Sequence, residues 1–319
     1  MPCVTTPVPP FCSRLAVTLV GVLVLINSAN MAALSAQETK RPAMHSTPQC
    51  PTTQEPTTQE QPLDVIALRP QRGSSYPADT LRISYRSPFD GAEDWALFLP
   101  GDPRKNTIVY LHGSFSFADQ IFTRKDIRAF WLTRILAGRH PLLSVNLRGT
   151  AYMSPAATAD LTALLGYCRA EFGCQRVVLL GGSGGASSAM AYAVLHPENI
   201  DGVIAMGMCD LVSRLDFARR SDNPLLQKLA RIVFDAYGAT PEEQPELYDA
   251  RSVLLHADRL TMPVILTMGE NDTLIPVAET RKIAAAMRGR PNFVYHEVPG
   301  GDHDAALWVD IDLETLNIR

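Results

Sequence analysis

The sequence predicts an α/β fold whose core is a doubly wound, mostly parallel β-sheet with helices on both faces. From Val65 onward, short β-branched runs alternate with longer segments of helical period, which is typical of βαβ units joined by right-handed crossovers. The runs at 107–111 and 177–180 are apolar without polar alternation, as strands covered on both faces require. Apolar residues make up 46% of the 319 residues and charged residues 19%, so the chain can bury a large core.

The charge balance argues against a nucleic-acid partner. The chain has 29 Lys and Arg against 33 Asp and Glu, a formal net charge of -4, and it contains no long basic run. A protein that binds phosphates along a nucleic acid needs a basic surface, so we expect no nucleic acid among the partners.

Residues 1–36 have the composition of a signal peptide. Arg14 precedes a 12-residue apolar run at 15–26, and small residues at 33–36 resemble a cleavage site. If the segment is not cleaved, the uncharged stretch 15–37 is long enough to anchor the chain in a membrane. In both cases Arg14 stays on the cytoplasmic side. The rest of the chain is then exported, to a secreted or periplasmic location, with membrane contact only if the segment stays attached.

Residues 37–62 are expected to form a disordered linker. They contain the pentapeptide Pro-Thr-Thr-Gln-Glu twice, at 51–55 and 56–60, and almost no large apolar side chains. Such a segment cannot bury enough surface to offset the entropy lost on ordering, so we interpret it as a tether between the export signal and the domain.

Residues 63–319 are expected to form one α/β domain whose closely spaced first strands pair antiparallel. The β-branched and apolar runs predict strands at 65–69, 81–86, 95–100, 107–112, 142–146, 176–180, 202–206, 264–268 and 293–298. The segments of helical period predict helices at 125–136, 156–171, 186–195 and 278–287, and a short helix from about residue 305. In such a sheet, ligands bind at the carboxyl ends of the strands.

A long interval interrupts the alternation between the strands predicted at 202–206 and 264–268. The segment 208–261 contains several prolines and a helical patch at 225–237. Long insertions at strand ends are often lids or binding surfaces. We therefore expect a helical, lid-like insert over the site. A pair of packing helices with no further role is the alternative.

A candidate nucleophile lies directly after the strand predicted at 176–180. Residues 181–185 are Gly-Gly-Ser-Gly-Gly and a predicted helix follows, which puts Ser183 in a sharp strand-to-helix turn. The flanking glycines allow the close approach of strand and helix. Gly-x-Ser-x-Gly in this position is typical of a nucleophile elbow, in which the serine hydroxyl projects from the sheet.

A serine hydroxyl needs a base to take its proton, and the base needs an acid that orients it. Asp272 and His303 each follow a predicted strand, at 264–268 and 293–298. Both therefore lie at the carboxyl end of the sheet, and the chain order is Ser, Asp, His. We predict that they complete a catalytic triad with Ser183.

Two other carboxylates are alternative acids. Asp210 follows the strand predicted at 202–206, and Glu270 lies two residues before Asp272. Among the seven histidines, His303 is the predicted base because it lies in a glycine-flanked loop at the correct end of the sheet.

Two backbone N–H groups are expected to bind the oxyanion that forms during acyl transfer. One belongs to Gly184, the residue after the nucleophile. The other should come from the loop after the strand at 107–112, which reads His-Gly-Ser-Phe from residue 112. Ser114 is the predicted donor and Phe115 the alternative, while His112 is expected to support the turn by hydrogen bonding.

No cofactor and no metal are expected. The glycines of the elbow lack the third glycine of a dinucleotide-binding fingerprint and the Lys of a phosphate-binding loop. The sequence has no His-Glu-x-x-His and no Cys-x-x-Cys pair.

Cys168 and Cys174 lie near the end of the helix predicted at 156–171. In an oxidising compartment they could close a short disulfide loop, and two reduced thiols are the alternative. The geometry of the pair decides between these possibilities.

With these features the chain resembles the α/β-hydrolases from about residue 64 to its end. The elbow at 181–185, the His-Gly turn at 112–113 and the acid and histidine loops carry the resemblance. Within that superfamily, the stretch 251–276, which includes Gly269 and Asp272, is similar to prolyl-oligopeptidase-like catalytic domains.

The resemblance implies a serine hydrolase that cleaves carboxylic esters through an acyl-enzyme on Ser183, and the predicted signal peptide implies that it is exported. A serine peptidase of the prolyl-oligopeptidase-like type is the first alternative. A non-catalytic binding protein on a hydrolase scaffold is the second, and it would be marked by a missing triad member. The expected partner is a small-molecule ester or peptide substrate.

Overall fold

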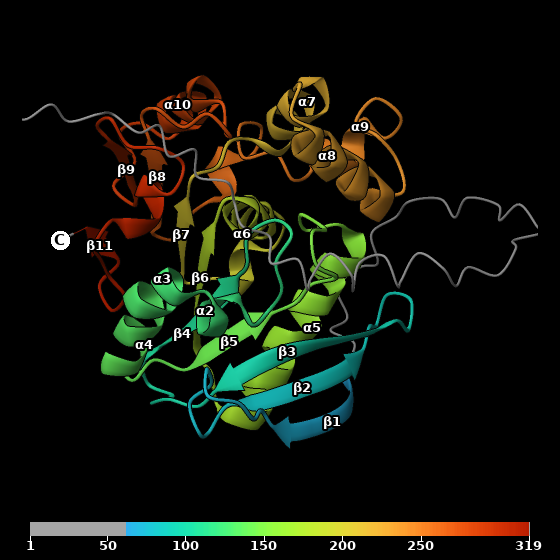
Figure 1. Ribbon diagram of the computed structural model, residues 1–319, viewed down its shortest axis with the longest axis vertical. Coiled ribbons are helices and arrows are strands. Elements are labelled where there is room, and N and C mark those ends of the chain that lie inside the picture. The colour runs from blue at the N-terminus through green and yellow to red at the C-terminus, as the bar shows by residue number, and fades with distance from the viewer. Residues whose placement is uncertain (1–61, 319) are drawn as a thin grey trace, which may run out of the picture. The chain divides into compact units, whose positions relative to one another are not determined.

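The computed structural model describes residues 62–318, which are built around a nine-stranded β-sheet (Figure 1). The strands are β1 (Asp64–Pro70), β2 (Leu81–Arg86), β3 (Glu93–Leu99), β4 (Asn106–Leu111), β5 (Leu142–Val145), β6 (Arg176–Gly182), β7 (Gly202–Met206), β8 (Val264–Gly269) and β9 (Phe293–Val298). All nine were predicted, with bounds that agree to within two residues. The predicted signal peptide and, except for Pro62, the predicted linker lie outside the described residues.

The strand order is β1-β2-β3-β5-β4-β6-β7-β8-β9. The first three strands pair antiparallel, and β3 is also antiparallel to β5. From β5 to β9 every pair is parallel, which confirms the doubly wound arrangement. The order reverses at β4, because the chain continues from β4 to β5 on one side and later to β6 on the other. Ligands of such sheets bind at this reversal, beyond the carboxyl ends of the strands.

Both faces of the sheet are covered, because successive residues of the central strands point to opposite sides. In β4, Val109 and Leu111 belong to the apolar cluster formed with α5 (Pro155–Phe172), α6 (Gly184–Leu195) and α10 (Val277–Ala286). Ile108 and Tyr110 belong to a second cluster on the other face, with α2 (Gln120–Thr123), α3 (Lys125–Ile127), α4 (Thr133–Ala137) and the C-terminal residues.

The helix predicted at 125–136 is not a regular α-helix. A π-helical segment, Arg128–Leu132, lies between α3 and α4. The extra residue of a π-turn shifts the helical register, and Trp131, within this turn, donates from Nε1 to the carbonyl of Leu307 at 3.0 Å. The π-helical segment therefore contacts the C-terminal segment. Such a long-range contact cannot be predicted from helical periodicity.

The C-terminal helix predicted from residue 305 is a single 3-10 turn, Ala305–Trp308. It is followed by a two-stranded hairpin of β10 (Ile311–Asp312) and β11 (Asn317–Ile318), which was not predicted. Strands of two residues are too short to produce a detectable alternation.

The segment 208–261 forms three α-helices and a 3-10 turn at Ala257–Arg259, as the predicted helical insert requires. The α-helices are α7 (Leu211–Arg220), α8 (Pro224–Tyr237) and α9 (Pro245–Asp249), and they lie together at the upper right of Figure 1. The insert has an apolar cluster of its own, which Tyr152 from the loop after β5 joins. The insert is therefore packed onto the α/β domain through that loop.

Cys168 and Cys174 are free thiols, so of the two alternatives the structure has the reduced pair. The backbone N–H of Cys174 donates to the carbonyl of Cys168 at 3.3 Å, and both side chains are buried. Among residues 62–318, no helix combines the length and the apolar character that a membrane span needs.

Candidate functional site

Ser183 occupies a strained turn between β6 and α6. Its backbone angles are φ 56° and ψ -120°, a region that costs a residue with a side chain roughly 1–3 kcal/mol. A Cβ at Gly181 would overlap the backbone of Gly185, and a Cβ at Gly185 would overlap the carbonyl of Leu111. Only glycines allow α6 to come this close to β6 and to the end of β4, so the local sequence produces the elbow.

Asp272 lies in the turn after β8, and its side chain has no exposed surface. Its Oδ1 accepts hydrogen bonds from the backbone N–H groups of Leu274, at 2.7 Å, and Ile275, at 2.9 Å. Its Oδ2 lies 2.6 Å from Nδ1 of His303. An ionised carboxylate only accepts hydrogen bonds, so this contact assigns the imidazole proton to Nδ1 and leaves Nε2 free to act as a base.

The imidazole of His303 lies over the end of β7, the strand beside the elbow. A Cβ at Gly207 would be 3.5 Å from its Cε1 and 3.7 Å from its Nδ1. The residue before Gly207, Met206, accepts a hydrogen bond from the backbone N–H of Ser183 at 2.8 Å. The structure thus brings the three predicted triad residues to the carboxyl ends of β6, β7 and β8.

The two predicted oxyanion donors also meet at the elbow. Gly184 is the first residue of α6 and is buried, and its N–H has no acceptor within its own helix. The positive end of the helix dipole favours a negative charge there. Ser114 lies beside it, because a Cβ at Gly184 would be 2.5 Å from the Ser114 Oγ. The alternative donor, Phe115, already donates its N–H to Thr150 Oγ1 at 2.8 Å.

Tyr152 is a site residue that the sequence analysis missed. Its hydroxyl lies 2.7 Å from the Ser114 Oγ, and 2.9 Å from the position that a Cβ at Gly184 would occupy. The two hydroxyls fill the space of a side chain at position 184, which explains the glycine there. The available signal was the position of Tyr152 in the loop after β5, another loop at the carboxyl end of the sheet.

The loop that carries Tyr152 is strained and firmly held. Tyr152, Met153, Leu147 and Arg148 all have φ between 43° and 61°. From the insert, the Tyr237 hydroxyl donates to the carbonyl of Tyr152 at 2.6 Å. Such conformations persist where surrounding contacts over-determine them, and they cluster at functional sites.

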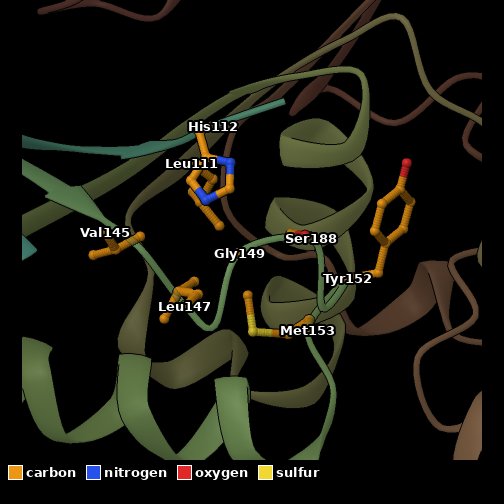
Figure 2. Close-up of a pocket in the computed structure, with 8 residues that line it drawn as sticks. All are labelled: Leu111, His112, Val145, Leu147, Gly149, Tyr152, Met153 and Ser188. Atoms are coloured by element: carbon orange, nitrogen blue, oxygen red, sulfur yellow. The ribbon is translucent and has the colours of Figure 1, made fainter. Parts of the chain in front are cut away.

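A small cavity lies beneath this loop (Figure 2), lined by Leu111, His112, Val145, Leu147, Gly149, Tyr152, Met153 and Ser188. Its volume of about 20 Å³ suits one water molecule. A substrate must therefore bind outside it.

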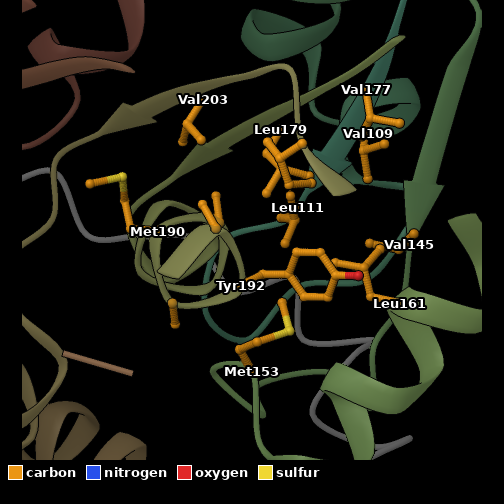
Figure 3. Close-up of a cluster of buried hydrophobic side chains, with 14 of the residues drawn as sticks. Val109, Leu111, Val145, Met153, Leu161, Val177, Leu179, Met190, Tyr192 and Val203 are labelled. Carbon is orange, nitrogen blue, oxygen red and sulfur yellow. The ribbon is translucent and has the colours of Figure 1, made fainter. Parts of the chain in front are cut away.

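Helix α6, which follows the elbow, packs against the sheet through buried side chains. Figure 3 shows Met190 and Tyr192 of α6 among the buried side chains of the sheet, including Leu179 of β6 and Val203 of β7. Both α6 side chains are fully buried. A packed support of this kind holds a nucleophile and its donors in a fixed geometry.

The alternative acids have other partners. Asp210 is buried, and burial raises the pKa of its carboxyl. Its Oδ1 accepts hydrogen bonds from Ser252 Oγ, at 3.0 Å, and from the Leu254 N–H, at 3.2 Å, both in the insert. The exposed Glu270 accepts from the N–H of Gly300 at 2.7 Å.

His112 supports the turn after β4, as expected. Its Nδ1 lies 2.8 Å from the carbonyl oxygen of Gly113, and its Nε2 lies 2.9 Å from that of Asn146. Burial lowers the pKa of the imidazole, which favours its neutral form. No cluster of three His, Cys, Asp or Glu side chains that could hold a metal occurs among the described residues.

The comparisons with known proteins agree with this architecture. The family model of the prolyl oligopeptidase family (Peptidase_S9) matches residues 156–309, which include the elbow and the acid and histidine loops. The Pyrococcus furiosus esterase Pf2001 is similar in structure, with a TM-score of 0.54 and 17% identity over 75% of this chain and 92% of the esterase. FphF, a fluorophosphonate-binding serine hydrolase of Staphylococcus aureus, has a TM-score of 0.54 and 13% identity, over 72% of this chain and 93% of FphF.

A puromycin-hydrolysing peptidase of Mycobacterium tuberculosis is also similar, with a TM-score of 0.52 and 20% identity. The match covers 69% of this chain but only 35% of the peptidase. The chain therefore spans about a third of that protein and nearly all of Pf2001 and FphF. These likenesses confirm the predicted fold class.

Proposed function

We propose that the chain is a serine hydrolase that cleaves carboxylic esters through an acyl-enzyme on Ser183, which the match to the prolyl oligopeptidase family model and the α/β-hydrolase fold support. His303 is the base and later the acid, and Asp272 orients it. The observation that carries the proposal is the 2.6 Å contact between Asp272 Oδ2 and His303 Nδ1, at the same end of the sheet as the strained serine.

The chemistry follows from the protonation of this pair. Nε2 of His303 takes the proton of Ser183 as Oγ attacks the ester carbonyl, and the tetrahedral oxyanion forms between the N–H groups of Gly184 and Ser114. Asp272 stabilises the imidazolium. Collapse of the intermediate expels the alcohol, which takes its proton from Nε2. Water, activated by the same nitrogen, then attacks the acyl-enzyme and releases the acid.

An ester is the favoured substrate because the esterase Pf2001 is matched along nearly its whole length. A peptide substrate is the second candidate, favoured by the match to the prolyl oligopeptidase family at 156–309. The two bonds differ in their leaving groups, since an amine must be protonated by the histidine as it departs whereas an alkoxide is a better leaving group. We expect the purified protein to hydrolyse short acyl esters much faster than the matching peptide amides.

The test is replacement of the nucleophile. Ser183→Ala should abolish turnover of p-nitrophenyl esters and labelling by a fluorophosphonate, with an unchanged circular dichroism spectrum. Ser188→Ala is a matched control, because Ser188 lies one turn further along α6 and donates to the carbonyl of Gly184. A Ser183 variant as active as the wild type would contradict the assignment of the nucleophile, and a wild type without activity would favour a non-catalytic binding protein.

We also propose that the enzyme is exported by residues 1–36 and that residues 37–62 tether the domain. The support is the sequence pattern of Arg14, the apolar run 15–26 and the small residues 33–36. N-terminal sequencing of the protein recovered outside the cytoplasm should begin after residue 35 or 36. Recovery of the active protein only from the cytoplasmic fraction, with residue 1 intact, would contradict export.

A further inference from the structure

Helix α7 carries an arginine on its buried face. Arg214 is 3% exposed and lies on the face that also buries Leu211, Leu215 and Ala218. A guanidinium in such a place is costly unless a specific partner compensates it. Its Nη1 donates to the carbonyl oxygen of Leu274 at 2.6 Å. Nε is also buried, and it has no hydrogen-bond partner among the described residues.

The partner of this arginine is part of the acid turn. The N–H of Leu274 donates to Oδ1 of Asp272 at 2.7 Å, while its carbonyl accepts from Arg214 at 2.6 Å. Leu274 is thus held at both polar atoms, by the guanidinium on one side and by the carboxylate on the other. Together with the N–H of Ile275, the N–H of Leu274 holds Oδ1 of Asp272, while Oδ2 lies 2.6 Å from Nδ1 of His303.

A buried thiol lies against the acid turn. Cys209 is fully buried against Ile275 of the acid turn. Burial raises the pKa of its thiol to about 12, so the thiol stays neutral. The guanidinium of Arg214 reaches the acid turn directly, through the carbonyl of Leu274.

We propose that Arg214 is a positioning residue, which holds the acid turn through the Leu274 carbonyl and so presents Asp272 to His303. The proposal rests on the proposed function, because it assigns Asp272 to the triad. It also gives the insert a second role. Because the insert holds the turn that carries Asp272, it cannot move away from the site as a lid without displacing Asp272.

The chain offers a matched control one residue away. Ser213 of α7 donates from Oγ to Glu279 Oε2 of α10 at 3.0 Å, so this hydrogen bond joins the insert to α10 and not to the acid turn. Ser213→Ala removes a contact between the insert and the α/β domain without touching Leu274. It should leave the kinetic constants unchanged if the acid turn is what matters.

The experiment compares Arg214→Met, Arg214→Lys and Ser213→Ala in the full chain with a p-nitrophenyl ester as substrate. We expect Arg214→Met to lower kcat about 100-fold, since a displacement of about 1 Å of catalytic geometry costs this much, with KM changed less than about twofold. Arg214→Lys keeps the positive charge and a hydrogen-bond donor, so its kcat should be about tenfold higher than that of Arg214→Met. Equal kcat in wild type and Arg214→Met would overturn the proposal.

A double-variant cycle separates positioning from loss of folding. If Arg214 acts only through the acid, Arg214→Met combined with Asp272→Asn should be no slower than Asp272→Asn alone. Multiplied losses would instead show an effect independent of Asp272 and contradict the proposal. If Arg214→Met does not fold, Arg214→Gln, which keeps a donor without the charge, takes its place in the cycle.

The same measurements distinguish the two proposals. A wild type without esterase activity, or an active Ser183→Ala, contradicts the proposed function. An active wild type and an inactive Ser183→Ala, together with an unimpaired Arg214→Met, contradict only the role of Arg214.

Discussion

Replacing Asp272 by asparagine tests the geometry of the acid directly, because the change keeps the size of the side chain. The oxygen of the new amide should stay with the N–H groups of Leu274 and Ile275, which donate to Oδ1 at 2.7 and 2.9 Å. The NH₂ group then faces His303, where the carboxylate oxygen now lies at 2.6 Å. An NH₂ group only donates, so it forces the imidazole proton onto Nε2.

The size of the effect follows from this exchange of tautomers. With the proton on Nε2, the imidazole cannot accept the hydroxyl proton of Ser183. The loss of a correctly oriented base costs about 10⁴ in kcat in the general triad template. The Asp272 side chain has no exposed surface, so water cannot substitute for it. We therefore expect kcat for a p-nitrophenyl ester to fall about 10⁴-fold at neutral pH.

The assay is steady-state ester hydrolysis at pH 7, accompanied by a thermal melt of each variant. Glu270→Gln is the matched control, because this exposed neighbour keeps an oxygen for the N–H of Gly300. Its kcat should equal that of the wild type. A loss smaller than about tenfold in Asp272→Asn would refute the assignment of the acid. A large loss in Asp210→Asn would then identify the alternative carboxylate.

Three further changes have defined outcomes. Gly184→Ala places a Cβ 2.5 Å from the Ser114 Oγ and 2.9 Å from the Tyr152 hydroxyl, so it should displace both groups and lower kcat at least tenfold in the same ester assay; an unchanged kcat would contradict their place beside the oxyanion donors. Tyr237→Phe leaves the carbonyl of Tyr152 without its 2.6 Å donor and should cost about 1–3 kcal/mol in urea unfolding; an unchanged midpoint would contradict the bracing of that loop. Asp90 has a pKa lowered to about 2 by its hydrogen bonds to Arg148, so it stabilises the fold above its ordinary pKa of 3.8 and loses this contribution as the pH falls through 2. Asp90→Asn should therefore be less stable than wild type at pH 6, by about 1 kcal/mol at most because the carboxylate is partly exposed, and equal to it near pH 2; a difference that persists there would contradict the pairing.

The sequence was sufficient for the sheet because its strands obey local rules. Runs such as 107–111 are apolar on both faces in the sequence and are buried on both faces in the structure. The elbow was also predictable, since the contact of β6 with α6 requires glycine at 181 and the contact of α6 with the end of β4 requires glycine at 185. The π-turn at Arg128–Leu132 was not, because its contact with Leu307 joins residues far apart in the chain.

The same distinction applies to the site. Ser183, Asp272 and His303 follow strands, so the topology of a parallel sheet alone brings them together. Tyr152 and Arg214 act through contacts between loops and the insert, which no local pattern specifies. A signal for Arg214 did exist, in the form of a charged residue on the apolar face of α7.

The most direct test of the central claim is the position of a covalent adduct. The purified protein is treated with a fluorophosphonate, digested and analysed by mass spectrometry. We predict one adduct, on the Oγ of Ser183, that does not form after Asp272→Asn or His303→Ala within the time needed to label the wild type completely. An adduct on another residue, or labelling of those variants at the wild-type rate, would contradict the triad.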